Sequence, residues 1–409
     1  MRILFAVAVL LSGFLSGRAN ADVPVSGPDP AQYITTFSIA GERLSGEGAA
    51  LLRQQTADAQ FVLVGEGHYD HLTPLFANAL FSMLREDHGF DYLAVEQDPV
   101  AIEEVLKREN RGNERRIGAL ARLYPSLFEF ASDEDIHLLA AVGGSQRRAP
   151  AIWGLEQATG AIRYLEELQS LAPNPAVRAE VTALLDQART ADHEPKYSVH
   201  FFAANAGLLP RLRALATAFH APANSRAQYL LTGLAASAEI FDYYRRGATE
   251  PLVALYNGTL REGWMKRQFV HYYDQAARTG ALPRVMFKFG GTHLGRGLNS
   301  NGAYSLGNFA SEFAIAHGMR SYGIQVVSLR GNGYGTLPAW MLRLLPASPP
   351  TQPILVDLQA LRAASSPFRA GLEPTMRRAQ VDLVFGFDAL VVLPGSRDAS
   401  MTLSGLTAS

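Results

Sequence analysis

The stretch Phe61–His68 reads FVLVGEGH, and it decides what kind of fold this chain can adopt. Four consecutive apolar residues are typical of a short strand that is buried on both faces, as the strands of parallel sheets are. The glycines that follow let the backbone turn sharply and approach a ligand closely. Glu66 and His68 therefore stand where ligands bind in open α/β sheets, at the carboxyl end of a strand.

The same pattern returns three times along the chain. Further apolar runs lead into an acidic residue or a histidine: 92–95 before Glu96, 151–155 before Glu156, and 285–289 before the motif GGTH, which ends at His293. More strands are expected at 323–328, 354–358 and 388–393. Helical periodicity lies between the strands, at 74–86, at 100–107 and twice within 114–142. The sequence thus predicts an α/β fold with a Rossmann-like, mainly parallel sheet flanked by helices.

Between about 160 and 280 the strand-like runs disappear. Ala, Leu, Arg and Glu dominate this stretch, in a pattern that indicates four or five helices. We interpret it as an all-α subdomain inserted into the α/β domain. The expected organisation is a signal peptide at 1–21, an N-terminal lead-in at 22–50, the first part of the α/β core at 51–159, the helical insertion at 160–280, the second part of the core at 281–397 and a C-terminal tail at 398–409.

The first residues have the pattern of a secretory signal peptide. Met1-Arg2 gives a positive start, residues 3–15 are almost entirely apolar, and Ala19-Asn20-Ala21 offers a cleavage site after Ala21. The apolar run is too short to cross a bilayer, although an N-terminal anchor helix is the alternative reading. We expect a periplasmic or secreted protein with no membrane span in the mature chain.

Composition excludes several classes of protein. The 37 basic and 38 acidic residues nearly cancel, so the electrostatic footprint of a nucleic-acid-binding protein is absent. The chain has no cysteine, which excludes a lipoprotein anchor and a thiol nucleophile. The G-x-S-x-G elbow, the phosphate-binding P-loop and the H-E-x-x-H zinc motif are missing as well. The expected partner is a small-molecule or peptide substrate.

The strand ends form the candidate site, because the carboxyl ends of parallel strands meet at one edge of a sheet. His68 and His293 are candidates for a general base or for metal ligands. Glu66 precedes His68 by two residues, so in extended backbone both side chains point the same way; it could orient the imidazole, polarise water or bind a metal. Glu96 is a candidate catalytic carboxylate. Glu156 is expected to bind substrate, although an acidic residue is also common where a helix begins.

Two further residues complete the candidates. Arg261 could bind an anion or stabilise an oxyanion, and its alternative role is a salt bridge on a helix. His71 follows the first motif and is expected to be either a substrate-binding residue or an ordinary loop residue.

Taken in order, these motifs resemble the erythromycin esterase-like, ChaN-like and TraB/Tiki superfamily. The resemblance covers about residues 55–395 and rests on GEGH at 65–68, Glu96, Glu156, the pair Arg261 and Met265, and GGTH at 290–293. It implies a Rossmann-like core with a helical insertion. In the esterase branch the matching histidines and glutamates support attack of water on a lactone ester without a metal, whereas Tiki-type relatives are metal-dependent proteases and ChaN-like relatives are linked to haem.

The first motif departs from the esterase branch. Its spacing, G-E-G-H, is one residue shorter than the G-E-x-x-H of those enzymes and is that of the ChaN and Tiki branches, which disfavours macrolide esterase activity. We therefore expect a hydrolase in which His68 activates water and Glu66 or Glu96 orients His68. Arg261 and His293 are expected to stabilise the developing oxyanion. A variant places Zn, Mn or Fe between His68, His293 and Glu66. The alternatives are a haem- or iron-binding protein that uses the same histidines, and a non-catalytic relative.

Overall fold

The computed structural model describes residues 29–145, 147–192, 201–247, 249–278, 280–331, 333–335, 337–365 and 378–405. The predicted signal peptide at 1–21 lies outside the described residues.

One sheet of eight strands organises the chain, in the order β1-β9-β10-β8-β4-β7-β5-β6. Its strands are β1 (Ile34–Thr36), β4 (Ala59–Glu66), β5 (Tyr92–Val95), β6 (Ile152–Gly154), β7 (Val285–Gly290), β8 (Arg320–Arg330), β9 (Ile354–Asp357) and β10 (Ala389–Ser396). The six strands from β10 to β6 pair in parallel, and β9 pairs antiparallel with both β10 and β1. A separate hairpin joins β2 (Ser38–Ala40) and β3 (Arg43–Ser45).

Strand β4 lies inside this sheet and is buried along its whole length. Because side chains alternate between the two faces of a strand, its apolar run serves two cores. Val62 and Val64 pack into one of them, and Phe61 and Leu63 pack into the other. Burial on both faces explains the unbroken apolar run that the sequence shows at this point.

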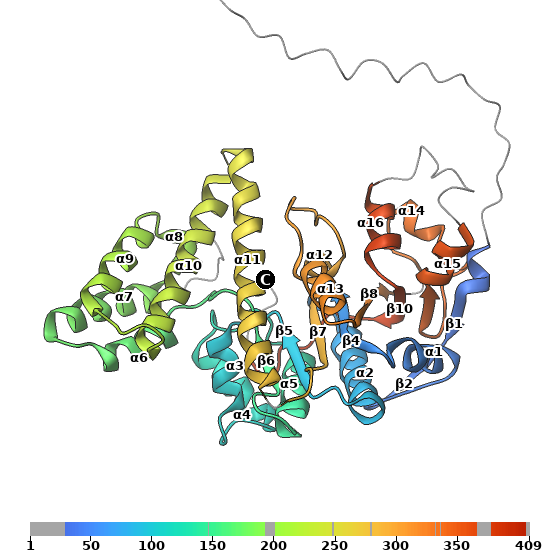
Figure 1. Cartoon of the computed structure of the whole chain (residues 1–409), viewed down its shortest axis with the longest axis horizontal. Coiled ribbons are helices and arrows are strands. Elements are labelled where there is room, and N and C mark those ends of the chain that lie inside the picture. The colour runs from blue at the N-terminus through green and yellow to red at the C-terminus, as the bar shows by residue number, and fades with distance from the viewer. Residues whose placement is uncertain are drawn as a thin grey trace, which may run out of the picture.

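Helices cover both faces of the sheet (Figure 1). Those that belong to the sheet domain are η1 (Pro30–Tyr33), α1 (Glu47–Thr56), α2 (Leu72–His88), α3 (Pro99–Leu106), α4 (Glu114–Leu123), α5 (Asp133–Gly144), α12 (Gly291–Leu294), α13 (Leu306–Ala316), α14 (Ala339–Leu342), α15 (Leu358–Ser365) and α16 (Arg378–Gly386). Ser132 caps α5 by accepting a hydrogen bond from the backbone N–H of Asp135, as its acidic first turn leads one to expect.

The remaining helices follow one another between β6 and β7. They are α6 (Ile162–Leu171), α7 (Pro175–Asp192), α8 (Phe201–Ala204), α9 (Leu208–Phe219), α10 (Arg226–Gly247) and α11 (Pro251–Ala277). In Figure 1 the first five form a lobe beside the sheet domain, and the long α11 stands between that lobe and the sheet. Helix α11 thereby reaches the edge of the sheet at which the parallel strands end.

The predicted fold class, a mainly parallel α/β sheet with an inserted helical subdomain, is confirmed. The inserted stretch differs in detail, because its described residues contain six helices where four or five were expected. The described part of the expected lead-in at 22–50 contributes β1 to the main sheet and begins α1. In the expected tail at 398–409, the N–H of Ser400 donates to Glu134 of α5.

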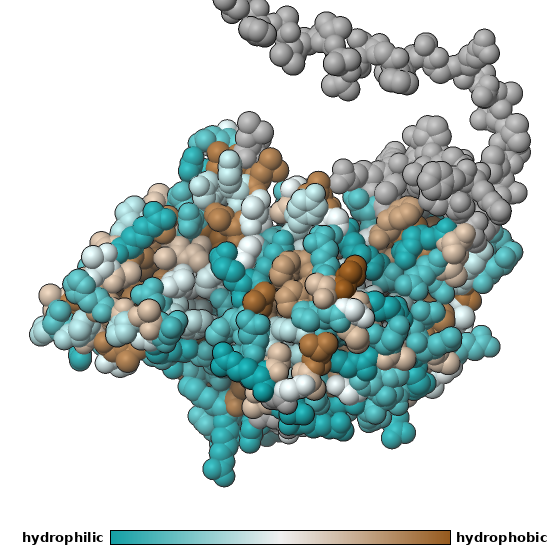
Figure 2. All heavy atoms as spheres, in the orientation of Figure 1, coloured by the Kyte–Doolittle hydropathy of each residue, from teal (hydrophilic) through white to brown (hydrophobic). Residues whose placement is uncertain are grey.

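On the face drawn in Figure 2, hydrophilic and hydrophobic residues are interspersed, and no single large apolar area stands out. Among the described residues, no helix is both long enough and apolar enough to cross a membrane.

Candidate active site

The sheet order brings the predicted site residues to one edge, because β4, β7, β5 and β6 are consecutive neighbours. Glu66 ends β4 and His68 follows it, while Glu96 follows β5 and Glu156 follows β6. His293 lies in α12, the short helix that begins directly after β7.

His68 stands at the open side of this group, with 30% of its side chain exposed. Its Nδ1 lies 3.3 Å from Oε1 of Glu66, and its Nε2 lies 3.8 Å from Oε2 of Glu96. Phe130 stacks on the imidazole with ring centroids 4.1 Å apart. Burial lowers the pKa of His68, but the hydrogen bond to Glu66 and the charge of Glu96 outweigh it, so the net pKa lies above its ordinary value.

His293 is the buried counterpart, with only 6% of its side chain exposed. Its Nδ1 lies 2.7 Å from Oε1 of Glu262, whose other oxygen accepts a hydrogen bond from the N–H of Leu306. Asn299 donates a second bond to Glu262. Burial lowers the pKa of His293, and the charge of Glu96 and the bond to Glu262 raise it to a net value above the ordinary one.

Glu96 connects the two imidazoles. Its Oε1 lies 3.4 Å from Nε2 of His293 and accepts a 2.9 Å hydrogen bond from Arg261. Its Oε2 faces His68 and accepts a 2.7 Å bond from the N–H of Gly290. Burial raises the pKa of Glu96, but the positive charges around it, those of His293 and Arg261 foremost, lower it to about 2. Glu96 is therefore a permanent anion between two titratable rings.

Arg261 projects from α11 towards the strand ends and binds the carboxylates that follow β5 and β6. Its Nε and Nη2 form a bidentate pair with the buried carboxylate of Glu156, at 3.0 and 2.6 Å, and Nη2 also binds Glu96. Such a fork fixes the plane of the guanidinium group. Nη1 forms no hydrogen bond with the described residues. The indole N–H of Trp264, one turn further along, donates to the backbone oxygen of Glu156.

A second cation, Lys288, is buried next to the carboxylate of Glu66. Lys288, in the middle of β7, donates to Oε1 of Glu66 and to Oδ1 of Asp135, both at 2.8 Å. Burial lowers the pKa of Lys288, but the two carboxylates outweigh it and hold the pKa above its ordinary value. Lys288 thereby fixes the carboxylate that contacts His68.

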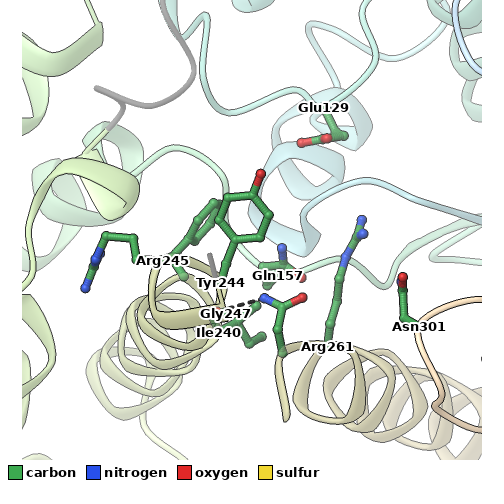
Figure 3. A pocket seen from close by; sticks show the side chains of 10 residues that line it. Glu129, Gln157, Ile240, Tyr244, Arg245, Gly247, Arg261 and Asn301 are labelled. Atoms are coloured by element: carbon green, nitrogen blue, oxygen red, sulfur yellow. Dashed lines mark hydrogen bonds between the residues drawn. The ribbon is translucent and has the colours of Figure 1, made fainter. Parts of the chain in front are cut away.

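A cavity of about 540 Å³ opens beside Arg261, between the helical lobe and the loops that follow the strands. Glu129, Gln157, Arg261 and Tyr244 line it together with residues of α10 and α11 (Figure 3). Figure 3 shows Tyr244 and Arg261 extending from the two helices towards the side that carries Glu129, while Arg245 points away. The cavity is large enough for a small organic substrate, and its wall reaches the guanidinium group of the site.

The structure brings together six of the seven predicted residues: Glu66, His68, Glu96, Glu156, Arg261 and His293. His71, by contrast, is paired with none of these six residues by a hydrogen bond or ion pair that the structure describes. It stands at the beginning of α2, and its Nδ1 lies 2.5 Å from Oε1 of Glu134.

Four participants were not predicted: Lys288, Asp135, Glu262 and Glu129. A lysine inside the apolar run VMFKFG was a usable signal for Lys288, because a lysine at a buried strand position needs a carboxylate partner. Asp135 could be interpreted only as a residue of a helical first turn. Glu262 and Glu129 gave no signal, since their place depends on how α11 and a loop dock on the sheet.

Three carboxylates of this site already have cations as partners. Glu66 binds Lys288, and Glu96 and Glu156 bind Arg261. Within the described part of the chain, no three or more histidine and acidic side chains form a group that could hold a metal ion. The residues around His68, His293 and Glu66 therefore do not fit the predicted metal. The haem alternative stays a prediction.

Fold and site together define an α/β protein that carries a histidine–carboxylate site at its strand ends and an inserted helical lobe above it. Solved structures share the fold of this chain. Their sequence identities to it are low and support a statement about the fold alone. A histidine-to-asparagine mutant of the erythromycin esterase EreC, in its open conformation, has a TM-score of 0.54 at 15% identity, over 90% of this chain and 98% of that one. The predicted resemblance is confirmed at the level of the fold.

Two other structures are similar to the same extent. A protein from Bacillus cereus has a TM-score of 0.52 at 12% identity, over 90% of this chain and 97% of its own. A succinoglycan biosynthesis protein has a TM-score of 0.56 at 14% identity, over 91% and 97%. No protein-family model matches the sequence, and no curated protein matches it.

Proposed function

We propose that this protein is a hydrolase in which His68 removes a proton from water so that the water attacks an ester or amide carbonyl. The observation that carries the proposal is the state of His68: it is the exposed imidazole of the pair, with Glu66 at Nδ1. A carboxylate at Nδ1 fixes the tautomer that leaves Nε2 as a proton acceptor.

The other groups have supporting roles. Arg261 offers Nη1 to the oxyanion that forms when water adds to the carbonyl, and such a donor contributes about 3–4 kcal/mol to barrier lowering. Glu96 stabilises the imidazolium of His68 once the proton has been taken up. His293 is too buried to contact substrate directly, so its role passes through Glu96. The fold shared with an erythromycin esterase supports a hydrolase, and the apolar segment at 3–15 supports a site of action outside the cytoplasm.

The test is turnover of a panel of small esters and peptides by the purified chain from Asp22 onward, beside His68→Ala. We expect turnover that falls by about 10²- to 10⁴-fold in the variant while the circular dichroism spectrum is unchanged. His137→Ala is the matched control, because that imidazole lies on α5 and pairs with Glu114. Equal turnover in His68→Ala and the wild type would contradict the proposal.

The haem alternative has its own readout. A Soret band that develops on titration with haem, and that is lost in His68→Ala or His293→Ala, would replace hydrolysis with ligand binding as the function of this site.

A further inference from the structure

One carboxyl group at the site has no function in the hydrolysis just described. Glu129 lies in the loop between α4 and α5 and lines the cavity beside Arg261. Its backbone N–H donates to Oε1 of Gln97, but its carboxyl oxygens have no hydrogen-bond partner among the described residues. A half-buried carboxyl group on the wall of a cavity, with no hydrogen-bond partner in the described part of the chain, is available to a ligand.

The loop that carries Glu129 is fixed against the catalytic residues. Gln97, which directly follows Glu96, accepts from the N–H of Glu129 at 3.0 Å and donates to the backbone oxygen of Phe130 at 2.5 Å. Phe130 in turn stacks on His68. One amide side chain thus holds both the ring that lies against the base and the carboxyl group that faces the cavity.

The surroundings of Glu129 keep a substantial part of its carboxyl groups protonated near neutral pH. Burial raises its pKa to about 7, and the negative charges of Glu156 and Glu96 act in the same direction. Arg261 and His68 act in the opposite direction and do not reverse the result. The phenol of Tyr244 is the remaining titratable group on the cavity wall that points to this side (Figure 3).

A second observation indicates that the cavity is built for a polar ligand. Gln157 also lines it, is buried, and has its Oε1 without any hydrogen-bond partner among the described residues. A buried amide oxygen left unpaired costs free energy, which a hydroxyl group of a ligand would recover.

We propose that Glu129 donates a proton to the leaving oxygen, and that the substrate is an ester of an ordinary alcohol whose alcohol half occupies this cavity. The inference rests on the proposed hydrolase function. Only an alkoxide needs such a donor, because a phenolate or a thiolate leaves as a stable anion.

The proton balance is complete within the site. His68 takes a proton from water while the water oxygen bonds to the carbonyl carbon. When the tetrahedral intermediate collapses, the bond between carbon and the ester oxygen breaks, the electron pair stays on that oxygen, and the proton of Glu129 moves to it. Acid and alcohol leave, and the proton held by His68 returns through solvent to the carboxylate of Glu129.

The experiment compares two acetate esters of similar size, benzyl acetate and p-nitrophenyl acetate, in the wild type and Glu129→Gln. We expect kcat/KM for benzyl acetate to fall by about 10²- to 10⁴-fold and kcat/KM for p-nitrophenyl acetate to be nearly unchanged. In the wild type, the rate with benzyl acetate should decrease above about pH 7 as Glu129 loses its proton, and the rate with p-nitrophenyl acetate should not. Glu42→Gln, at an exposed turn, is the matched control.

Glu129→Asp separates proton donation from shape, since it retains a carboxyl group and should restore part of the benzyl acetate rate. Equal losses with both esters, or no loss with either, would overturn the role of Glu129 while leaving the hydrolase function in place. If His68→Ala retains wild-type turnover of both esters, the proposed function itself fails, and this inference fails with it.

Discussion

The two imidazoles of the site have matching partners and different surroundings. Each has a glutamate at Nδ1, Glu66 for His68 and Glu262 for His293, and both direct Nε2 at Glu96. They differ in exposure, because the side chain of His68 is 30% exposed and that of His293 only 6%. Under the proposed function, this difference in exposure separates the roles of the two rings: we expect the exposed ring to exchange protons with water and substrate, and the buried ring to orient the shared carboxylate.

The largest expected effect comes from replacing each ring in turn. His68→Gln should reduce turnover by about 10²- to 10⁴-fold with little change in the free energy of unfolding. His293→Gln should reduce turnover less than His68→Gln does. It should lower the free energy of unfolding by about 1–3 kcal/mol, because Glu262 loses a buried partner. Ester hydrolysis and urea unfolding measure the two quantities. Equal effects of both substitutions on both quantities would show that the rings are equivalent.

The next prediction concerns Glu262, the carboxylate that holds the buried ring of His293 in place. In Glu262→Ala, His293 Nδ1 and the N–H of Leu306 both lose their acceptor, so we expect a loss of about 2–3 kcal/mol in the free energy of unfolding. Urea denaturation measures the change, and Glu109→Ala, in an exposed turn, is the control. An unchanged free energy of unfolding in Glu262→Ala would mean that this carboxylate does not stabilise the position of His293.

A smaller effect concerns the space beside the exposed ring. A Cβ at Gly290 would lie 2.7 Å from His68 Nε2 and 3.4 Å from Glu96 Oε2. Gly290→Ala should therefore displace the imidazole, and a displacement of about 1 Å from the productive position lowers kcat/KM by up to about 10²-fold. Gly207→Ala serves as the control, because its Cβ would meet no atom within 4 Å. Unchanged kcat/KM in Gly290→Ala would show that the ring does not act from its present position.

The smallest expected effect is a shift along the pH axis. The base must be neutral to accept a proton, so the rate should rise with pH through the pKa of His68, which lies above its ordinary value. Glu66→Gln removes a negative charge that favours the imidazolium, so this pKa falls and the rising limb moves to lower pH, by less than about one unit. Rate profiles of the two proteins measure the shift. A move to higher pH would contradict the role of Glu66.

The centre of the fold could be predicted from the sequence, and its edge could not. The runs at 61–64 and 285–289 are mostly apolar because both faces of β4 and β7 are buried. Such a run can be recognised from the sequence alone. Strand β1 has only three residues, none of them fully buried, and it pairs antiparallel at the edge, so nothing in ITT distinguishes it from a loop.

The site divides in the same way. Glu66, His68, Glu96 and His293 could be predicted, since each lies at the carboxyl end of an apolar run that reads as a strand. Asp135 could not, because its first-turn position already explained an acidic residue, and its pairing with Lys288 depends on how α5 docks.

The position of Arg261 has a consequence for how the molecule is made. Arg261 and Glu96 are 165 residues apart in the chain, and Lys288 and Glu66 are 222 apart. During synthesis Glu66 and Glu96 are translated long before Lys288 and Arg261. Their carboxylates therefore stay hydrated until these cations have been added to the chain. Contacts of such long range close slowly. Helical content should therefore return early in refolding, and the site should form last, when Arg261 and Lys288 pair with carboxylates from the first 100 residues.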